Sequence, residues 1–503
     1  MAQSWFEMDM KLHQNRHRNK FLQISKGAAD AGNCAEESYF TQILDHFDNK
    51  STVTWNQRYQ INDKYLNNAK NSSLDGPAIF LNIGGEQETI DERVICYEIF
   101  PMVKMAKQHN ALLIQLEHRF FGKSFPIIKN GSMADMSVPT LRQFLTVQQA
   151  LEDLANFIRN FKYKNVEWKN PKWILFGGSY PGSLCAWSRA KYPDLTVGGI
   201  CSSAPIWPKM DFYEYSEVME FAITNYSAIK YPNCAKSVTD GFTQLRQMSY
   251  TDNGRNTLNN LFNITPPLNP KTSADISFDI QNFHASVFSP FVNIVQYNYD
   301  YAYLSSSKYN IDKVCKKFST TPDPIKAIRD IFFGEISDSN GNIPTQFSNN
   351  YVASIIGFKQ TAYNFSDARI AQFSTLRGWK WLTCGSALGW LPTTDNPNGM
   401  FSHMMPLSKI IQLCTDIFDP SINADYISKK VAETELQFPR NYSATNVVLT
   451  NGDYDPWSAL GGFTTNEKMH QFSVITHGAA HGADSNPYIS GEPDGLQNTR
   501  KFY

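Results

Sequence analysis

A short glycine-rich segment at residues 176–182 constrains the fold of this chain more than any other stretch. It reads Phe-Gly-Gly-Ser-Tyr-Pro-Gly, it overlaps the end of the apolar run 173–176, and it precedes a second apolar run at 184–187. A buried strand that turns sharply into a helix strains the residue at the turn, so its neighbours favour glycine. The template Gly-x-Ser-x-Gly is met here with the second glycine one place late. The segment predicts a strand–turn–helix unit with Ser179 at the turn as a candidate nucleophile.

Strand-length apolar runs alternate with helical patterns around this unit. Runs at 77–85 and 111–116 precede it, with a helix predicted near 97–109 between them. Apolar residues then recur at steps of three and four from 144 to 158, which is the period of an amphipathic helix. A further strand is predicted at 197–201. Apolar strands that alternate with helices are typical of a mainly parallel sheet covered on both faces, which is an α/β fold.

The pattern changes after residue 207. Helical stretches such as 211–229 and 324–333 follow, broken by turns rich in proline and asparagine, and strands resume only at 446–450 and 472–475. We therefore expect an α/β-hydrolase sheet interrupted by a large helical cap insertion. The predicted division is an unstructured extension at 1–36, the first part of the hydrolase domain at 37–207, the cap at 208–430, and the second part of the hydrolase domain at 431–503.

Charge and hydropathy exclude several classes of function. The formal net charge is −1, with no long block of one sign, which argues against a nucleic-acid partner because phosphate binding needs a basic face. No apolar run approaches the length of a membrane-spanning helix, so no membrane role is expected. No cofactor and no metal site are expected either.

The compartment is indicated by several weak signals. Residues 1–23 are polar and basic and contain no apolar core of signal-peptide length. Eight cysteines, an even number, are compatible with disulfides, although free thiols in an intracellular enzyme are the alternative. We interpret the protein as a secreted or lysosomal glycoprotein. The candidate glycosylation sites are the seven Asn-x-Ser/Thr sequons at Asn49, Asn71, Asn130, Asn225, Asn263, Asn364 and Asn441.

A serine nucleophile needs a base, and the base needs a carboxylate that fixes its tautomer. In an α/β-hydrolase these follow the serine in the order acid and then histidine. The strand at 446–450 is followed by Asp453 and Asp455, and the strand at 472–475 is followed by His477 and His481. Both groups fall at the carboxyl ends of strands, the sheet edge where Ser179 is also expected.

Other candidate residues of the site come from the same edge. The backbone N–H of Tyr180 is expected to donate to the oxyanion, with a second donor from the Gly84-Gly85-Glu86 loop, assigned to Gly85. Glu86 would either attract a substrate's terminal ammonium or pair with Arg119. Trp457 is a candidate wall for a substrate proline, because a flat apolar ring stacks well on an indole; plain core packing is the alternative.

Taken together, the ordered motifs resemble one peptidase family. It is the family of lysosomal prolyl carboxypeptidase, dipeptidyl peptidase II and thymus-specific serine peptidase, with the closest similarity to the thymus-specific branch. The resemblance runs from about residue 40 to 484. It rests on Leu44–Phe47 with Gln57–Tyr59, Asn82–Glu86, Glu117–Ser124, Ala150–Asp153, Gly177–Gly182, Ser203–Pro205, Asn451–Trp457 and Gly478–Asp484.

This resemblance implies roles for individual residues. It implies Ser179 as nucleophile, Asp455 as the acid and His481 as the base, in preference to Asp453 and His477. It also implies peptide substrates, a homodimer, and disulfides that join Cys234 to Cys315 and Cys384 to Cys414. A pairing of Cys185 with Cys201, leaving Cys34 and Cys96, is one of many that the spacing allows. The segment 117–119 is interpreted as structural, because buried charges persist only when paired.

The chain also departs from the family. The second histidine that many relatives carry after the base is Gly482 here, which puts recognition of a substrate's carboxyl terminus in doubt. The stretch 384–390 replaces the family's Thr-Glu-Phe-Gly run beside the pocket, so a changed proline specificity is expected. No closing helix is evident after Asp484.

The sequence thus indicates a serine exopeptidase that cleaves peptides adjacent to proline through an acyl-enzyme, with the cap limiting access to short or terminal segments. It does not decide whether peptides are cut from the amino or the carboxyl end. An esterase or lipase on the same scaffold is one alternative, since one fold hosts many chemistries. A non-catalytic binding protein on the same fold is the other.

Overall fold

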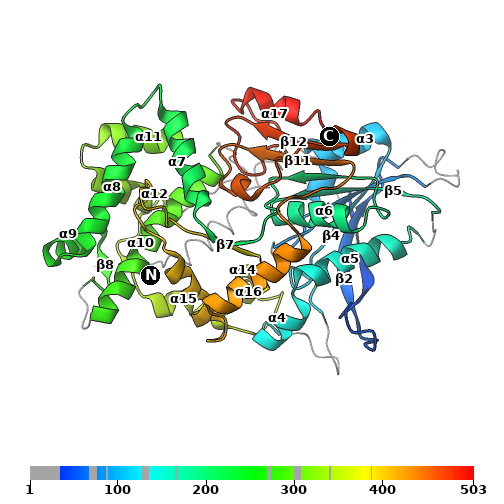
Figure 1. The fold of residues 1–503 in the computed structure, drawn as a ribbon, viewed down its shortest axis with the longest axis horizontal. Coiled ribbons are helices and arrows are strands. Elements are labelled where there is room, and N and C mark those ends of the chain that lie inside the picture. The colour runs from blue at the N-terminus through cyan, green and yellow to red at the C-terminus, as the bar shows by residue number, and fades with distance from the viewer. Residues whose placement is uncertain are drawn as a thin grey trace.

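The centre of the computed structural model is one eight-stranded sheet (Figure 1). The model describes residues 34–66, 76–86, 89–126, 135–164, 168–268, 273–298, 308–338, 341–386 and 388–503. The strand order is β1-β2-β4-β3-β5-β6-β11-β12; β2 is antiparallel to both of its neighbours, and the remaining pairs are parallel. The strands are β1 Glu36–Ile43, β2 Thr54–Asn62, β3 Ala78–Ile83, β4 Leu112–Leu116, β5 Lys172–Gly178, β6 Gly198–Ser202, β11 Val447–Gly452 and β12 Gln471–Thr476.

Helices cover both faces of this sheet because its central strands are apolar on both sides. On one face, Leu112 and Ile114 of β4 pack in a cluster with Leu151 of α5 (Val147–Asn160) and Leu184 of α6 (Tyr180–Lys191). On the other face, Leu113 belongs to a cluster with side chains of α3 (Pro101–His109). Three short helices, α2, α4 and α17, complete this part of the chain, at Arg93–Cys96, Val138–Phe144 and Asp494–Thr499.

Between β6 and β11 the chain is mainly helical, and Figure 1 shows α7 to α12 gathered at one end of the molecule, away from α3 and α5. These helices are α7 Glu214–Ser227, α8 Cys234–Ser249, α9 Asp252–Phe262, α10 Ser273–Gln296, α11 Ile311–Thr320, α12 Pro324–Ile336, α13 Tyr351–Ile355, α14 Ala368–Cys384, α15 Leu407–Ile417 and α16 Ala424–Gln437. Two small sheets lie among them, formed by β7 (Lys209–Phe212) with β10 (Gly389–Pro392) and by β8 (Ile264–Thr265) with β9 (Phe347–Ser348). The fold is therefore an α/β-hydrolase sheet with a helical insertion, as the sequence predicts.

Two of the sequence predictions concern the ends of the chain. The prediction of an unstructured 1–36 lies outside the described residues except at its end, where Cys34 is bonded to Cys96 and β1 begins at Glu36. The expectation of no closing helix after Asp484 is wrong: α17 follows, and its Leu496 packs with Ala479 and Ala483. This helix is only 6 residues long, too short to show a helical period in the sequence.

No helix within the described ranges combines the length and the apolar character needed to cross a bilayer.

The insertion contains a carboxylate whose protonation couples stability to pH. Burial, and to a lesser extent the charge of Glu217, raises the pKa of Glu220 on α7 to about 7, although the Met400 N–H, 2.8 Å away, opposes the shift. Because the folded state holds this proton more tightly than the unfolded state, stability is full below the unfolded pKa and declines as pH rises toward 7.

We expect Glu220→Gln to remove this decline. Near pH 5 the free energy of unfolding of the variant should match that of the parent chain. At pH 7.5 the variant's free energy of unfolding should be higher by about 1 kcal/mol, a figure reduced for the partial exposure of the side chain. Thermal unfolding at both pH values measures the difference. The control is Glu433→Gln, at an exposed carboxylate that pairs with Lys430. A parallel pH profile for Glu220→Gln and the parent chain would contradict the assignment.

Candidate active site

Ser179 stands at the sharp turn between β5 and α6. Its backbone has φ 65° and ψ −133°, a region that residues with a side chain rarely adopt. A Cβ on Gly177 would lie 2.2 Å from the Pro181 oxygen, and a Cβ on Gly182 would lie 2.7 Å from the Ser202 oxygen. These two glycines are therefore required by close packing of the turn against α6 and β6. Gly182 stands one place later than the second glycine of the Gly-x-Ser-x-Gly template, and its close contact with β6 explains why glycine is needed at that place.

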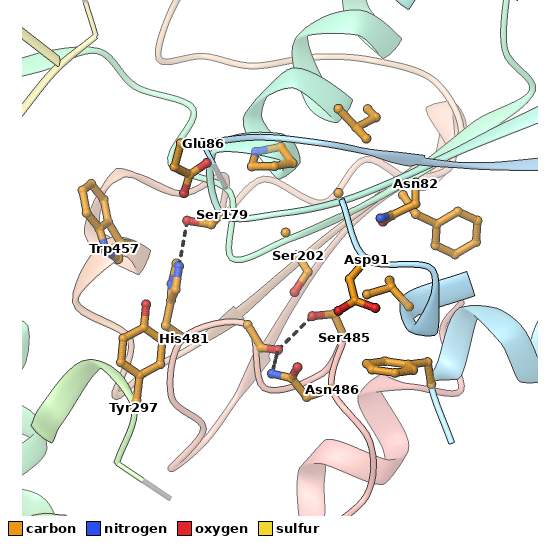
Figure 2. Close-up of a pocket in the computed structure, with 18 of the residues that line it drawn as sticks. Asn82, Glu86, Asp91, Ser179, Ser202, Tyr297, Trp457, His481, Ser485 and Asn486 are labelled. Carbon is orange, nitrogen blue, oxygen red and sulfur yellow. Dashed lines mark hydrogen bonds between the residues drawn. The ribbon is translucent and has the colours of Figure 1, made fainter. Parts of the chain in front are cut away.

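The side chains of Ser179, His481 and Asp455 form one hydrogen-bonded path, and Figure 2 shows the bond between Ser179 and His481. The Nε2 atom of His481 lies 2.8 Å from the Ser179 Oγ, and its Nδ1 atom lies 2.9 Å from both carboxylate oxygens of Asp455. Asp455 is fully buried, and because a carboxylate only accepts hydrogen bonds, Nδ1 of His481 donates to it. The Nε2 lone pair then faces the serine hydroxyl, as a general base requires.

The two competing residues form a separate pair. Asp453 accepts a hydrogen bond from Gly478 N at 2.6 Å and lies 2.9 Å from the Nδ1 of His477. The His477 side chain is 91% exposed, which places this pair at the surface. Asp453 therefore holds the turn before the His481 loop and does not contact His481.

Two backbone donors lie close to the serine. Gly85 follows β3, and a Cβ on it would come within 2.4 Å of the Pro181 Cγ, so this loop packs tightly on the first turn of α6. Tyr180 is the first residue of that helix, where N–H groups lack helical partners. Neither the Gly85 N–H nor the Tyr180 N–H donates to another group in the described part of the chain.

The buried His118 side chain contacts the first residue of α6, next to the turn that carries Ser179. The Nδ1 atom of His118 lies 2.7 Å from the Arg119 carbonyl, which can only accept, so His118 donates there. Its Nε2 then accepts from the Tyr180 hydroxyl at 3.0 Å. Burial lowers the pKa of His118 to about 4, so the ring stays neutral in this arrangement.

The Glu117–Arg119 segment is held in the interior by paired charges, in accord with the structural role that the sequence indicates. Glu117 accepts from Arg58 at 3.2 Å and from Ser124 at 2.8 Å. Arg119 binds both carboxylate oxygens of Asp153 at 2.6 Å, and its other donors go to main-chain carbonyls. Arg119 therefore pairs with Asp153 and not with Glu86.

A cavity of about 390 Å³ opens above Ser179, between the sheet edge and the insertion. Glu86 and Trp457 both line it, and Figure 2 shows Glu86 beyond the Ser179 end of the hydrogen bond to His481 and Trp457 beside that bond. The Trp457 ring lies 6.3 Å from the His481 ring. It also packs 5.5 Å from the Tyr215 ring, so it belongs to the cavity wall and to the aromatic core together.

The insertion supplies residues that the sequence reasoning missed. The backbone oxygen of Gln296, at the end of α10, accepts from the His481 N–H at 3.0 Å. Gln296 Oε1 also accepts from Trp457 Nε1 at 3.1 Å, and the next residue, Tyr297, places its ring 6.0 Å from that of His481. Trp379 of α14 lines the same cavity. No motif marks these residues, because they belong to irregularly spaced helices whose approach to the sheet the sequence does not reveal.

Asp484 anchors the histidine loop to the sheet. Its carboxylate is buried and accepts from Ser202 Oγ at 2.5 Å and Thr450 Oγ1 at 2.6 Å, and the Tyr503 hydroxyl also donates to it. The loop that carries His481 is thus fixed to β6, to the end of β11 and to the C-terminal segment.

The two departures from the family pattern, Gly482 and the stretch 384–390, lie in the histidine loop and beneath the cavity wall. Gly482 has φ 64°, a conformation that favours glycine, and its N–H donates to Ser203 Oγ at 2.8 Å. In the stretch 384–390, Trp390 is 1% exposed and stacks on Trp187, so it packs beneath the cavity wall instead of forming it.

The described residues contain four disulfides, and no cysteine among them is free. Both pairings implied by the family resemblance are present, and the remaining four cysteines pair in the way left open by the sequence. The bonds are Cys34–Cys96, Cys185–Cys201, Cys234–Cys315 and Cys384–Cys414.

Five of the seven sequon asparagines lie in the described part of the chain, and all five are exposed: Asn49, Asn225, Asn263, Asn364 and Asn441. Asn71 and Asn130 lie outside the described residues.

Comparison with known proteins gives one consistent result. The model of the family described as "Serine carboxypeptidase S28" matches residues 42–503. A Caenorhabditis elegans protein named "Putative serine protease F56F10.1" is 38% identical, over 95% of this chain and 86% of its own. The human "Lysosomal Pro-X carboxypeptidase" is 28% identical over 88% and 82% of the two chains. The mouse "Thymus-specific serine protease" is 25% identical over 93% and 86%. The identities of 28% and 25% are too similar to assign the chain to the carboxypeptidase branch or to the thymus-specific branch of the family.

Proposed function

Because the chain belongs to the serine carboxypeptidase S28 family, and is thus a serine-type peptidase, we propose that it cleaves peptides through an acyl-enzyme on Ser179. His481 is the general base and Asp455 orients it. The observation that carries this proposal is the path from the Ser179 hydroxyl through the His481 ring to the buried Asp455 carboxylate.

The geometry suggests how each step proceeds. His481 Nε2 takes the Ser179 proton as Oγ attacks the scissile carbonyl, and Asp455 stabilises the imidazolium that forms. The N–H groups of Tyr180 and Gly85 donate to the oxyanion of the tetrahedral intermediate. His481 then gives its proton to the leaving amine. Water attacks the acyl-enzyme with His481 again as base, which releases the acid product and restores the serine hydroxyl.

The insertion favours terminal cleavage of short peptides. It contacts the histidine loop through Gln296 and closes one side of the cavity with Trp379. A cavity of about 390 Å³ falls at the lower end of the range of small-ligand sites, so it suits a few residues and not a folded chain. We propose that Trp457 stacks on a substrate proline, in line with the Pro-X specificity in the name of the human relative.

Glu86 supports recognition of an amino terminus. It lines the cavity beside the oxyanion loop, and its charge contributes, after burial, to the raised pKa of Tyr180. Because Glu86 places a carboxylate in the cavity that Ser179 also lines, we propose that it attracts a substrate ammonium. We further propose a lysosomal or secreted location, because the disulfides and exposed sequons suit an oxidising compartment.

Fluorophosphonate labelling tests the nucleophile. We expect one covalent label, mapped by peptide mass spectrometry to Ser179. Ser485 lines the same cavity and serves as an internal control that should remain unmodified. A label on any other serine, or none on Ser179 in folded protein, would contradict the proposal. Profiling a peptide library at pH 5 and pH 7 then identifies the terminus attacked and the preference for proline.

A further inference from the structure

The carboxyl end of the sheet carries a polar row on a face that is otherwise apolar. Gln115 of β4 pairs in register with Asn82 of β3, and Asn82 pairs in register with Phe176 of β5. Two residues earlier on the same face, Phe80 and Leu113 belong to the packed core under α3. Central strands of a parallel sheet are normally apolar throughout, so two adjacent amides here need an explanation.

These amides have hydrogen-bonding capacity left over. Asn82 Nδ2 donates to Gln115 Oε1 at 3.2 Å, and Gln115 is only 2% exposed. Within the described ranges, the Gln115 amide nitrogen and the Asn82 amide oxygen have no other partner. Gln60, the register partner of Gln115 in β2, is 5% exposed, and its Oε1 is buried without a partner. Unsatisfied buried polar groups are costly, which favours a ligand or ordered water at this row.

The row opens onto the proposed nucleophile. Asn82 and Gln115 line the same cavity as Ser179, and Figure 2 shows Asn82 on the side of Ser179 opposite to Trp457. Gly178 lines the same cavity, and on β5 it lies between Phe176, the register partner of Asn82, and Ser179. A Cβ on Gly178 would meet nothing closer than Ser485 Oγ at 3.7 Å, so crowding does not require glycine there. The missing side chain keeps the passage from Ser179 to the row open.

The side chains around the polar row favour an uncharged ligand group, because the carboxylate on this side of the cavity is already paired. Asp91 is the carboxylate on this side of the cavity, and Arg93 binds both of its oxygens, at 2.9 and 2.5 Å. Ser485 and Asn486 add uncharged polar groups. Whichever way the two amides are flipped, the Asn82–Gln115 pair presents one donor group and one acceptor. A carboxamide matches both, whereas a carboxylate offers acceptors alone.

We propose that Asn82 and Gln115 form a specificity subsite for a substrate side chain that ends in a carboxamide, that of glutamine or asparagine. The ligand carbonyl accepts from one amide and the ligand NH₂ donates to the other. This inference rests on the proposed function, because the subsite acts on substrates of Ser179.

Cleavage of matched peptides tests the subsite. In a set of hexapeptides, one position at a time carries Gln, Met or Glu, and kcat/KM is measured for each. At one position we expect Gln to exceed Met, which has a similar shape but makes neither hydrogen bond, by about tenfold. In Gln115→Met this ratio should fall to about 2 or less, because the variant removes one of the two hydrogen bonds to the carboxamide. Gln244→Met, the same change at an exposed site on α8, should keep the tenfold ratio.

Two further measurements separate the possible failures. Gly178→Ala narrows the passage without removing a polar group, and it should also reduce the preference for Gln. If Ser179 is labelled but Gln and Met peptides are equal at every position, or if the preference survives Gln115→Met, the subsite is wrong and the proposed function stands. If no peptide is cleaved, calorimetric binding of Gln and Met peptides to Ser179→Ala still tests the subsite alone, and equal affinities would overturn it.

Discussion

Replacing Asp455 with Asn should lower kcat for peptide hydrolysis by about 10⁴-fold while leaving the fold intact. The carboxylate accepts from the His481 Nδ1–H at 2.9 Å, which leaves the Nε2 lone pair free for the serine proton. An asparagine amide that donates to Nδ1 would stabilise the opposite tautomer. Nε2 would then carry a proton and could not act as base toward Ser179. The measurement is kcat on a proline-containing peptide found by library profiling.

Asp453→Asn provides the matched control. The two aspartates are two residues apart in one turn, but Asp453 faces the exposed His477 and not His481. We expect this variant to retain kcat within about threefold, since exposed ion pairs contribute little. Thermal unfolding of both variants checks that neither is simply misfolded. A larger loss for Asp453→Asn than for Asp455→Asn would reverse the assignment of the acid.

The elements around the candidate site could be predicted because their sequence signals are local. Each central strand is a short, mainly apolar run, and Gly177 beside Ser179 is fixed by its close approach to Pro181 within the turn itself. Strands β1 and β2, at one side of the sheet, were not predicted, because they lie beside the parallel core and carry many polar residues. Thr54–Asn62, for example, includes Gln57, Arg58 and Gln60. Their burial depends on neighbours far along the chain, which periodicity does not reveal.

The cap side of the site could not be predicted for the same reason. Gln296 and Trp379 lie on different helices of the insertion, and only tertiary packing brings them to the sheet edge. Gly178 is a different case. Its sequence position suggested a glycine required by the turn, yet the structure places open space there, and the constraint falls on Gly177 instead. A motif therefore identified the turn, but not which of its glycines shapes the cavity.

Ser179→Ala should abolish fluorophosphonate labelling and lower kcat by about 10⁶-fold, because it removes the hydroxyl that we propose as the nucleophile. Affinity for a peptide should change little, since the cavity and the oxyanion donors remain. A residual rate within tenfold of the parent enzyme would show that another nucleophile or a water-mediated route dominates. Binding measured by calorimetry separates loss of chemistry from loss of the site.

Ser179→Gly carries a second expectation that alanine does not. The backbone at this position has φ 65° and ψ −133°, a conformation that costs a residue with a Cβ of the order of 1 kcal/mol and glycine much less. Both variants should be inactive, but the glycine variant should unfold at a higher temperature than the alanine variant. Equal or reversed stability would mean that the turn stores no strain at Ser179. The expected order would show that the chain gives up stability to present its serine hydroxyl to His481.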